Sequence, residues 1–140
     1  MTGIDALIEQ ILRTNDTITV VGASASPGKA AYDVPAAMRR HGWRIVPVNP
    51  RGGEILGERA YQTLAEAPRP VGLVDVFRPA EEAPDIAMAA IAAGATALWL
   101  QLGIVSPEAR AIADRAGLPY VEDRCVFVER QRLGITGAHA

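Results

Sequence analysis

The chain has 140 residues, a formal net charge of −2 and one cysteine. This balanced charge, with no cluster of Lys and Arg, argues against a nucleic-acid partner. A single cysteine excludes an internal disulfide and fits a reducing compartment. The alanine-rich stretch over 86–100 is too short to span a bilayer, and the N-terminus lacks a signal-peptide pattern. These features predict a soluble, cytoplasmic single domain over 1–140 with no membrane partner.

The first third of the chain shows one helix pattern, one strand pattern and a proline that complicates the next helix. Residues 3–14 are predicted to form an amphipathic helix, because apolar side chains recur at Ile4, Leu7, Ile8, Ile11 and Leu12. The β-branched run over 17–22 predicts a buried strand. The next helix either begins at Asp33 as N-cap, with Pro35 in its first turn, or begins near Gly28 and bends at Pro35.

The rest of the chain alternates between predicted strands and helices. Pro47 places the strand over 43–49 near a sheet edge or in an irregular part of the sheet. The other predicted elements are a short strand and a short helix within 50–68, strands over 72–77, 95–103 and 118–123, helices over 79–94 and 106–117, and a helix or strand over 124–134. The tail over 135–140 is expected to fray. This order predicts an α/β fold with a doubly wound, mostly parallel five-stranded sheet and helices on both faces.

In such a sheet, ligands bind beyond the carboxyl ends of the strands. The first strand leads into the segment "GASASPGKAA", which begins at Gly22 and precedes a helix. Backbone N–H groups, a helix N-terminus and the two hydroxyls of Ser24 and Ser26 would together suit a pyrophosphate. The alternative is a plain tight turn between strand and helix, because a lone glycine-rich turn is a weak signal.

The second strand ends in "VNPRGGE", where an NAD site would carry an acidic residue for the ribose hydroxyls. Arg51 stands close to that place, and Glu54 comes too late. A guanidinium beside the ribose suggests an extra phosphate, which NADP carries at the 2′ and coenzyme A at the 3′ position. Arg78, after the third strand, is a second phosphate candidate. Both arginines could instead be solvated, and Phe77 could cover an adenine or pack in the core.

Four blocks of sequence carry a family resemblance: the run from "VVGASASPGK" to "LAEAP" over 20–68, "VGLVDVFR" over 71–78, "ALWLQLGI" over 97–104 and "VEDRC" over 121–125. In this order they resemble the small stand-alone CoA-binding proteins. Those proteins are similar to the N-terminal CoA-binding domain of the succinyl-CoA synthetase alpha subunit and of ADP-forming acyl-CoA synthetases. The resemblance runs from about Thr17 to Arg130.

The resemblance implies a Rossmann-like domain that holds coenzyme A across the strand ends. The pyrophosphate would lie against Gly22, Ala23, Ser24 and Ser26, with Lys29 as a further phosphate contact. The adenosine end would face Asn49, Pro50 and Arg51. The turn after the third strand would contribute Val76, Phe77 and Arg78. The pantetheine arm would be held by Gln101 and Gly103.

The same resemblance also shows what is missing for ligase chemistry. The larger relatives need a phosphorylated histidine from a second domain and an ATP-binding subunit, and neither His41 nor His139 falls near the predicted site. Cys125 is the only candidate nucleophile, and it could form a mixed disulfide with the CoA thiol or act as a small buried hydrophobe. No residue pattern predicts a catalytic group or a metal site.

We therefore predict a non-catalytic protein that binds coenzyme A or an acyl-CoA and serves as a carrier, sensor or regulatory module. Two other classes stay open: an NADP-dependent oxidoreductase, and a protein-interaction subunit whose nucleotide site is idle. A homodimer is a further possibility that the sequence leaves open.

Overall fold

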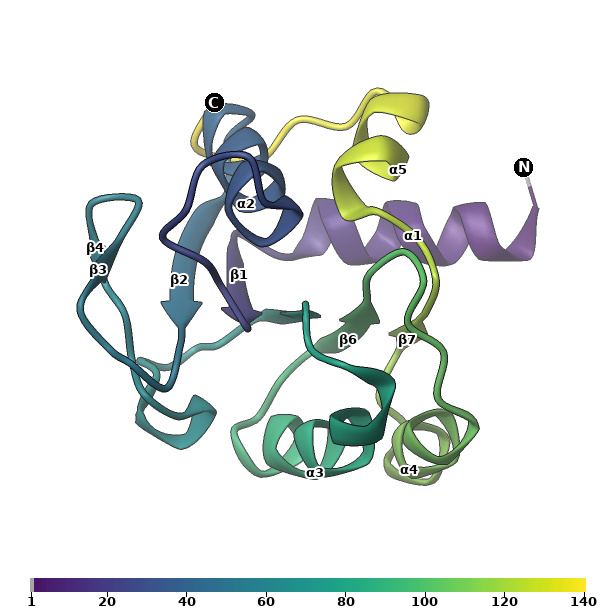
Figure 1. The fold of residues 1–140 in the computed structure, drawn as a ribbon. Helices are drawn as coiled ribbons and strands as arrows, with labels where there is room; N and C mark the ends of the chain where they lie inside the picture. Colours follow the sequence, from purple (N-terminus) through teal and green to yellow (C-terminus); the bar gives the residue numbers. More distant parts are fainter. Residues whose placement is uncertain (1) are drawn as a thin grey trace.

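The computed structural model describes residues 2–140 and contains a five-stranded parallel sheet with the order β2-β1-β5-β6-β7 (Figure 1). Its strands are β1 (Thr17–Val21), β2 (Arg44–Val48), β5 (Leu73–Val76), β6 (Ala97–Leu100) and β7 (Tyr120–Val121). The helices are α1 (Gly3–Thr14), α2 (Ala30–Arg40), α3 (Ala83–Ala92), α4 (Pro107–Ala116) and α5 (Val126–Leu133). The predicted doubly wound α/β fold is confirmed.

Helices cover both faces of the sheet, and the two faces are packed differently. Helices α3 and α4 lie on one face, while α1, α2 and α5 lie on the other (Figure 1). Alanines pack against the sheet on the first face: Ala83, Ala87, Ala90, Ala109 and Ala113. The other face buries the larger side chains, among them Trp43, Trp99 and Met38. Within residues 2–140, no helix is long and apolar enough to cross a bilayer.

Short elements lie between β2 and β5, where the sequence predicts a short strand and a short helix. Strands β3 (Glu54–Ile55) and β4 (Glu58–Arg59) form an antiparallel hairpin, and η1 (Leu64–Glu66) is a 3₁₀ turn. A second 3₁₀ turn, η2 (Ala80–Glu82), precedes α3. Strand β2 is an edge strand of the main sheet, so the interpretation of Pro47 as an edge residue is confirmed.

Helix α2 begins at Ala30, so of its two predicted starts the earlier one is correct and Pro35 lies inside the helix. The last element is a helix, α5, rather than a strand. The tail over 135–140, which the sequence predicts to fray, contacts the rest of the domain in the structure. Ile135 is fully buried, and the amides of Gly137 and His139 donate to the carbonyl oxygens of His41 and Gly42 at 2.8 Å. The tail therefore packs on the end of α2.

The connection after β1 determines where a ligand can bind. The chain runs from β1 through α2 to β2 on one side, then returns to place β5 on the other side of β1. The strand order thus reverses between β1 and β5, and the carboxyl ends of these two strands leave a crevice. The turns after β1, β2, β5 and β6 all open toward this crevice.

Candidate functional site

At the switch point, the turn after β1 packs directly against the turn after β5. Gly22 has a φ of +88°, a conformation that residues with side chains disfavour. A Cβ atom added at Gly22 would lie 2.8 Å from the Phe77 carbonyl oxygen and 2.8 Å from Arg78 Cδ. Glycine is therefore required here both by the backbone conformation and by the close approach of the two turns.

The loop between β1 and α2 is held in shape by hydrogen bonds, one of which uses a helix carbonyl group that Pro35 leaves free. Pro35 has no N–H to donate to the Ala31 carbonyl, four residues earlier in α2. That carbonyl instead accepts the Ser24 amide at 3.1 Å. Ser24 Oγ then accepts the Ser26 amide at 3.0 Å. A residue that looks like a helix boundary in the sequence thus ties the loop to the first turn of α2.

Asp33 secures the other end of this loop, in a position that the N-cap prediction missed. It lies in the first turn of α2, where its Oδ1 accepts the Gly28 amide at 3.1 Å. In the β1–α2 loop and the first turn of α2, the amides of Ala25, Ala30 and Ala31 have no hydrogen-bond partner within residues 2–140. These amides lie at the positive end of the α2 dipole, which favours an anion.

Asn49 connects the turn after β2 to the same loop. Its Nδ2 donates to the Ala23 carbonyl oxygen, and its Oδ1 accepts the Arg51 amide, both at 2.8 Å. The amides of Gly22 and Ala23 in turn donate to the Val48 carbonyl oxygen. The polar groups of Asn49 are therefore used within the protein, and its role is to position the turn that carries Arg51.

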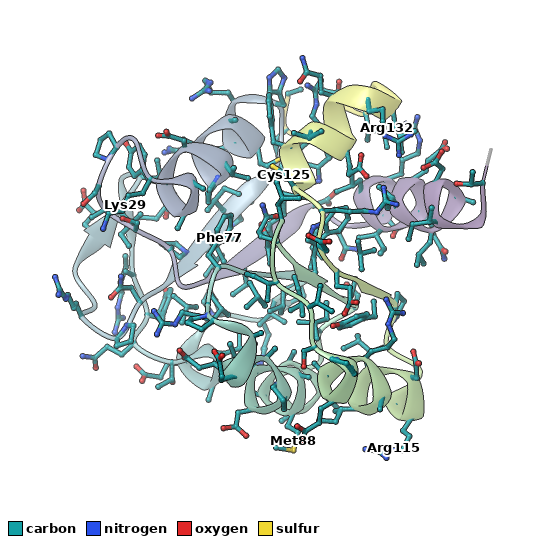
Figure 2. The ribbon with its side chains drawn as sticks, turned by 45° about the vertical axis from the view of Figure 1, so that its right-hand side comes forward. Lys29, Phe77, Met88, Arg115, Cys125 and Arg132 are labelled. Atoms are coloured by element: carbon teal, nitrogen blue, oxygen red, sulfur yellow. The ribbon has the colours of Figure 1, made fainter. Side chains whose placement is uncertain are left out.

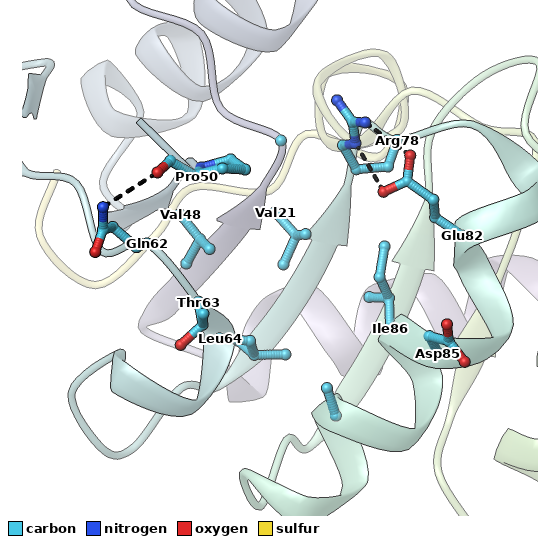
Figure 3. Close-up of a pocket in the computed structure, with 12 residues that line it drawn as sticks. Val21, Val48, Pro50, Gln62, Thr63, Leu64, Arg78, Glu82, Asp85 and Ile86 are labelled. Carbon is cyan, nitrogen blue, oxygen red and sulfur yellow. Dashed lines mark hydrogen bonds and ion pairs between the residues drawn. The ribbon is translucent and has the colours of Figure 1, made fainter. Parts of the chain in front are cut away.

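The turn after β5 presents Arg78, whose charge is already paired. Its Nε and Nη2 donate to the two carboxylate oxygens of Glu82 at 3.1 Å and 2.7 Å (Figure 3). These hydrogen bonds lower the pKa of Glu82 and raise the pKa of Arg78. A ligand phosphate at this position would have to share the guanidinium with Glu82.

Three neighbouring cavities open along the strand ends, and Arg78 lines all of them. The α3 cavity, of about 290 Å³, is walled by Val21, Val48, Leu64 and Ile86 (Figure 3). The loop cavity, of about 490 Å³, lies between the β1–α2 loop and the turn after β2. The Cys125 cavity, of about 520 Å³, lies between the start of α2, the turns after β5 and β6, and Cys125. Gly22 and Pro50 link the first two cavities, and Ala31 links the last two.

The turn after β6 carries Gln101, whose polar side chain is oriented by a hydrogen bond from the N-terminal end of α5. Gln101 has only 5 % of its surface exposed and lines the Cys125 cavity. Its Oε1 accepts the Val126 amide at 3.1 Å, at the start of α5. No partner within residues 2–140 takes a hydrogen bond from its Nε2. Because this hydrogen bond fixes Oε1, the Nε2 amide group remains available to donate a hydrogen bond to a ligand in this cavity.

Eleven of the thirteen residues that the sequence nominated line these cavities. The loop cavity takes in Gly22, Ala23, Ser24, Ser26, Lys29, Asn49, Pro50, Arg51 and Arg78, and the Cys125 cavity adds Phe77 and Gln101. The other two line none of these three cavities. Val76 is fully buried in β5, and the Gly103 amide donates to Asp123 Oδ1 at 2.7 Å.

Of the residues nominated from the sequence, only Gly22, Pro50 and Arg78 line the α3 cavity. Its wall includes Leu64 of η1 and Ile86 of α3, which come from a loop and from a helix rather than from the strand ends. Val48 could have been found, because it is the last residue of β2. The lining contributed by Ala31 and Ile55 in the loop cavity was also missed.

One buried carboxyl group lies outside the three cavities. Asp75, in β5, has 1 % of its surface exposed, and its Oδ1 has no hydrogen-bond partner in the described chain. Burial raises the pKa of Asp75 well above its usual value, so the fold favours the neutral acid. Within residues 2–140, no group of three or more His, Cys, Asp and Glu side chains could hold a metal ion.

Comparison with known proteins places this chain in a family. The model of a CoA binding domain matches residues 16–131, which include every turn described above. The chain belongs to the CoA-binding domain family. The uncharacterized protein YneT of Bacillus subtilis is 36% identical over 123 residues, which cover 88% of this chain and 91% of YneT.

A solved structure from Thermus thermophilus, described as cell-free ID.343, is 39% identical, has a TM-score of 0.88, and covers 95% of this chain and 99% of its own. The alpha subunit of an ADP-forming acetate–CoA ligase from Pyrococcus furiosus is 33% identical over 76 residues. That match covers 50% of this chain and only 16% of the ligase subunit. The CoA-binding domain is thus related to part of an acyl-CoA synthetase.

Proposed function

We propose that this protein binds coenzyme A across the three cavities and acts as a non-catalytic carrier, sensor or regulatory module. The observation that carries the proposal is the order of the cavities. A cavity lined by amides, hydroxyls and cations lies between two that are mostly apolar. Coenzyme A has the same order of parts, with its phosphates between an adenine and a pantetheine arm.

The loop cavity suits the pyrophosphate. The free amides of Ala25 and Ala31 face an anion at the start of α2, and Ser26 and Lys29 add a hydroxyl and an ammonium group. Because Pro35 and Asp33 hold the loop in place, little conformational entropy would be lost on binding.

Arg51 is our candidate for the 3′-phosphate. It lines the loop cavity, its side chain is exposed, and it forms no ion pair with any residue in the described chain. An unpaired guanidinium can form a bidentate contact with a phosphate. This assignment predicts that the protein binds coenzyme A more tightly than the form that lacks the 3′-phosphate.

The α3 cavity is our candidate for the adenine. Val21 and Val48 form one side of this cavity, and Ile86 of α3 forms the other, which gives two apolar walls for a flat ring (Figure 3). The adenine would then lie away from Phe77, which lines the Cys125 cavity and packs against the core. In the Cys125 cavity, the Gln101 Nε2 would donate to an amide carbonyl oxygen of the pantetheine arm.

The positions of the histidines support a non-catalytic role. Neither His41 nor His139 lines any of the three cavities. The His41 ring instead lies beside Phe127, with the ring centroids 5.7 Å apart. A phosphohistidine relay of the kind used by CoA ligases would therefore have no histidine of this segment at the strand ends.

The test is a set of thermal melts with CoA, NADP and NAD in parallel. At a CoA concentration of 100 times Kd, binding adds roughly 2.7 kcal/mol, which raises Tm by roughly 8–10 °C for a domain of this size. A rise with NADP alone would instead indicate an oxidoreductase. No rise with any ligand would indicate an idle site.

Two variants make this test specific to the loop cavity. Ser26→Glu places a carboxylate among the phosphate ligands and should abolish the rise in Tm caused by CoA. Gln131→Glu adds the same charge on α5, outside the three cavities, and should leave that rise intact. Equal shifts in both variants would mean that CoA does not bind at this loop.

A further inference from the structure

The wall of the Cys125 cavity is apolar beyond the point where a pantetheine arm would enter. Val34 of α2 and Phe77 pack against the core on one side, so this wall is supported from behind. Leu102 and Ile104, after β6, form the other side. The thiol of Cys125 is half-buried between them. Such a lining offers contact area to an alkyl group rather than to a charged group.

The charges around this cavity also favour an uncharged ligand group. Of the residues that line it within the described chain, only Arg78 carries a charge, and Glu82 already pairs with it through two hydrogen bonds. A ligand carboxylate placed here would lose its hydration without gaining an unpaired cation, which is unfavourable. The cavity therefore selects against a charged end group.

An exposed leucine lies at the mouth of the cavity. The Leu102 side chain has 71 % of its surface exposed, the largest value among the large apolar residues in the described chain. In a folded domain, an isolated exposed leucine is ordinary. Here, however, Leu102 continues the apolar wall outward, so an alkyl chain lying in the cavity would cover it.

We propose that the Cys125 cavity receives the acyl group of a CoA thioester, and that the ligands of this protein are thioesters with neutral, apolar acyl groups. This inference rests on the proposed CoA function and adds a ligand class to it. The arm would run from the loop cavity past Ala31, which lines both cavities, and place the thioester near Cys125. The acyl chain would then lie against Ile104 and Leu102.

The test compares dissociation constants for CoA, acetyl-CoA, butyryl-CoA and succinyl-CoA by isothermal titration calorimetry. Each fully buried methylene contributes about 0.8 kcal/mol, or roughly fourfold in affinity. Butyryl-CoA has two more methylenes than acetyl-CoA, and because they would be mostly but not fully buried in this open cavity, it should bind about tenfold tighter. Succinyl-CoA has the same number of acyl carbons as butyryl-CoA but ends in a carboxylate. It should bind at least tenfold more weakly than butyryl-CoA.

A pair of variants assigns this preference to the cavity. Leu102→Ser should lower the butyryl-to-acetyl preference from about tenfold to about threefold. Met88→Ser removes another exposed apolar side chain, on α3 and far from Cys125, and should leave the preference at about tenfold (Figure 2). Both positions are exposed, so neither change removes a core contact.

The outcomes separate this inference from the function on which it rests. If CoA binds but butyryl-CoA binds no tighter than acetyl-CoA, the acyl site is wrong and the CoA function stands. Binding of succinyl-CoA as tight as that of butyryl-CoA overturns the acyl class in the same way. If none of the four ligands binds, the CoA function itself fails.

Discussion

The turns after β2 and β5 both carry an arginine to the candidate site, but the two arginines are not equivalent. Arg51 is exposed and forms no ion pair within residues 2–140, whereas Arg78 donates two hydrogen bonds to Glu82. Glu82 lies four residues after Arg78, at the end of η2. The comparison shows that the position of a cation at a strand end does not establish that its charge is available to a ligand.

The two turns also differ in how they are attached to the loop after β1. Asn49 binds its turn to the loop by a hydrogen bond to the Ala23 carbonyl oxygen. The turn after β5 is held by contact, since Gly22 leaves no room for a Cβ atom beside Phe77 and Arg78. One turn is therefore positioned by polar bonds and the other by close packing.

The largest effect is expected where the close packing is broken. Gly22→Ala should lower the free energy of unfolding by about 3–4 kcal/mol, because a Cβ atom both clashes with the turn after β5 and strains the backbone. Gly103→Ala is the matched control, with the same φ of +88° and no heavy atom within 4 Å of the added Cβ atom. It should cost about 1–2 kcal/mol. Equal losses in urea unfolding would refute the packing argument.

The next effect tests the free arginine. Arg51→Ala should weaken CoA binding about tenfold, since charge-assisted hydrogen bonds to a phosphate would be lost. The affinity for 3′-dephospho-CoA should hardly change. Arg115→Ala, on α4 and away from the loop, removes the same charge and should leave both affinities unchanged (Figure 2). A tenfold loss for both ligands in Arg51→Ala would show that Arg51 does not bind the 3′-phosphate.

A third effect concerns the strand that leads to the paired arginine. The pKa of Asp75 is raised by burial, so the unfolded chain releases this proton at a lower pH than the folded protein does. The stability contributed by the neutral acid is complete at low pH and is lost as the pH rises toward the raised pKa. Asp75→Asn keeps nearly the same side-chain shape and removes the group that titrates. It should stabilise the fold at neutral pH by about 1 kcal/mol, the usual size of a single-substitution effect, because the amide has no charged form whose burial is unfavourable.

This third prediction is checked by urea unfolding between pH 4 and pH 8. The parent protein should lose stability relative to Asp75→Asn as the pH rises through that range. A constant difference between the two proteins would mean that Asp75 does not titrate differently in the folded and unfolded states.

The smallest effect tests the paired arginine. Glu82→Gln releases Arg78 from its carboxylate and should tighten CoA binding about two- to threefold, because a half-exposed ion pair contributes little. The gain should shrink at high salt. Glu81→Gln is the control, because it removes a neighbouring charge that forms no ion pair in the described chain. Weaker CoA binding in Glu82→Gln would contradict the view that Glu82 competes with the ligand.

The sequence predicted the strands and turns well because local patterns determine them. The glycine after β1, the residues after β2 and Gln101 after β6 follow from the rule that ligands bind at strand ends, whereas Gly103 lies outside the cavities. The pairing of Arg78 could also have been predicted from the sequence, since Glu82 stands at the i,i+4 spacing. The effect of Pro35 could not have been predicted, because the carbonyl group that it frees accepts a hydrogen bond from Ser24, which the sequence places in a loop.

Contacts between distant segments explain what the local sequence patterns do not indicate. Gly137 packs against Gly42 so closely that a Cβ atom added at Gly137 would clash with the Gly42 carbonyl oxygen. No local pattern indicates that these two glycines meet, and so the tail was predicted to fray. The α3 cavity is likewise formed by η1 and α3, which come together only in the folded sheet.

The most direct test of the account is calorimetric titration of the unmodified protein with CoA and with 3′-dephospho-CoA at the same ionic strength. If the pyrophosphate binds at the loop and the 3′-phosphate at Arg51, both ligands bind, and CoA binds about tenfold tighter. Equal affinities would contradict the role of Arg51. No heat of binding with either ligand, together with no change in Tm, would contradict the central claim that these cavities hold coenzyme A.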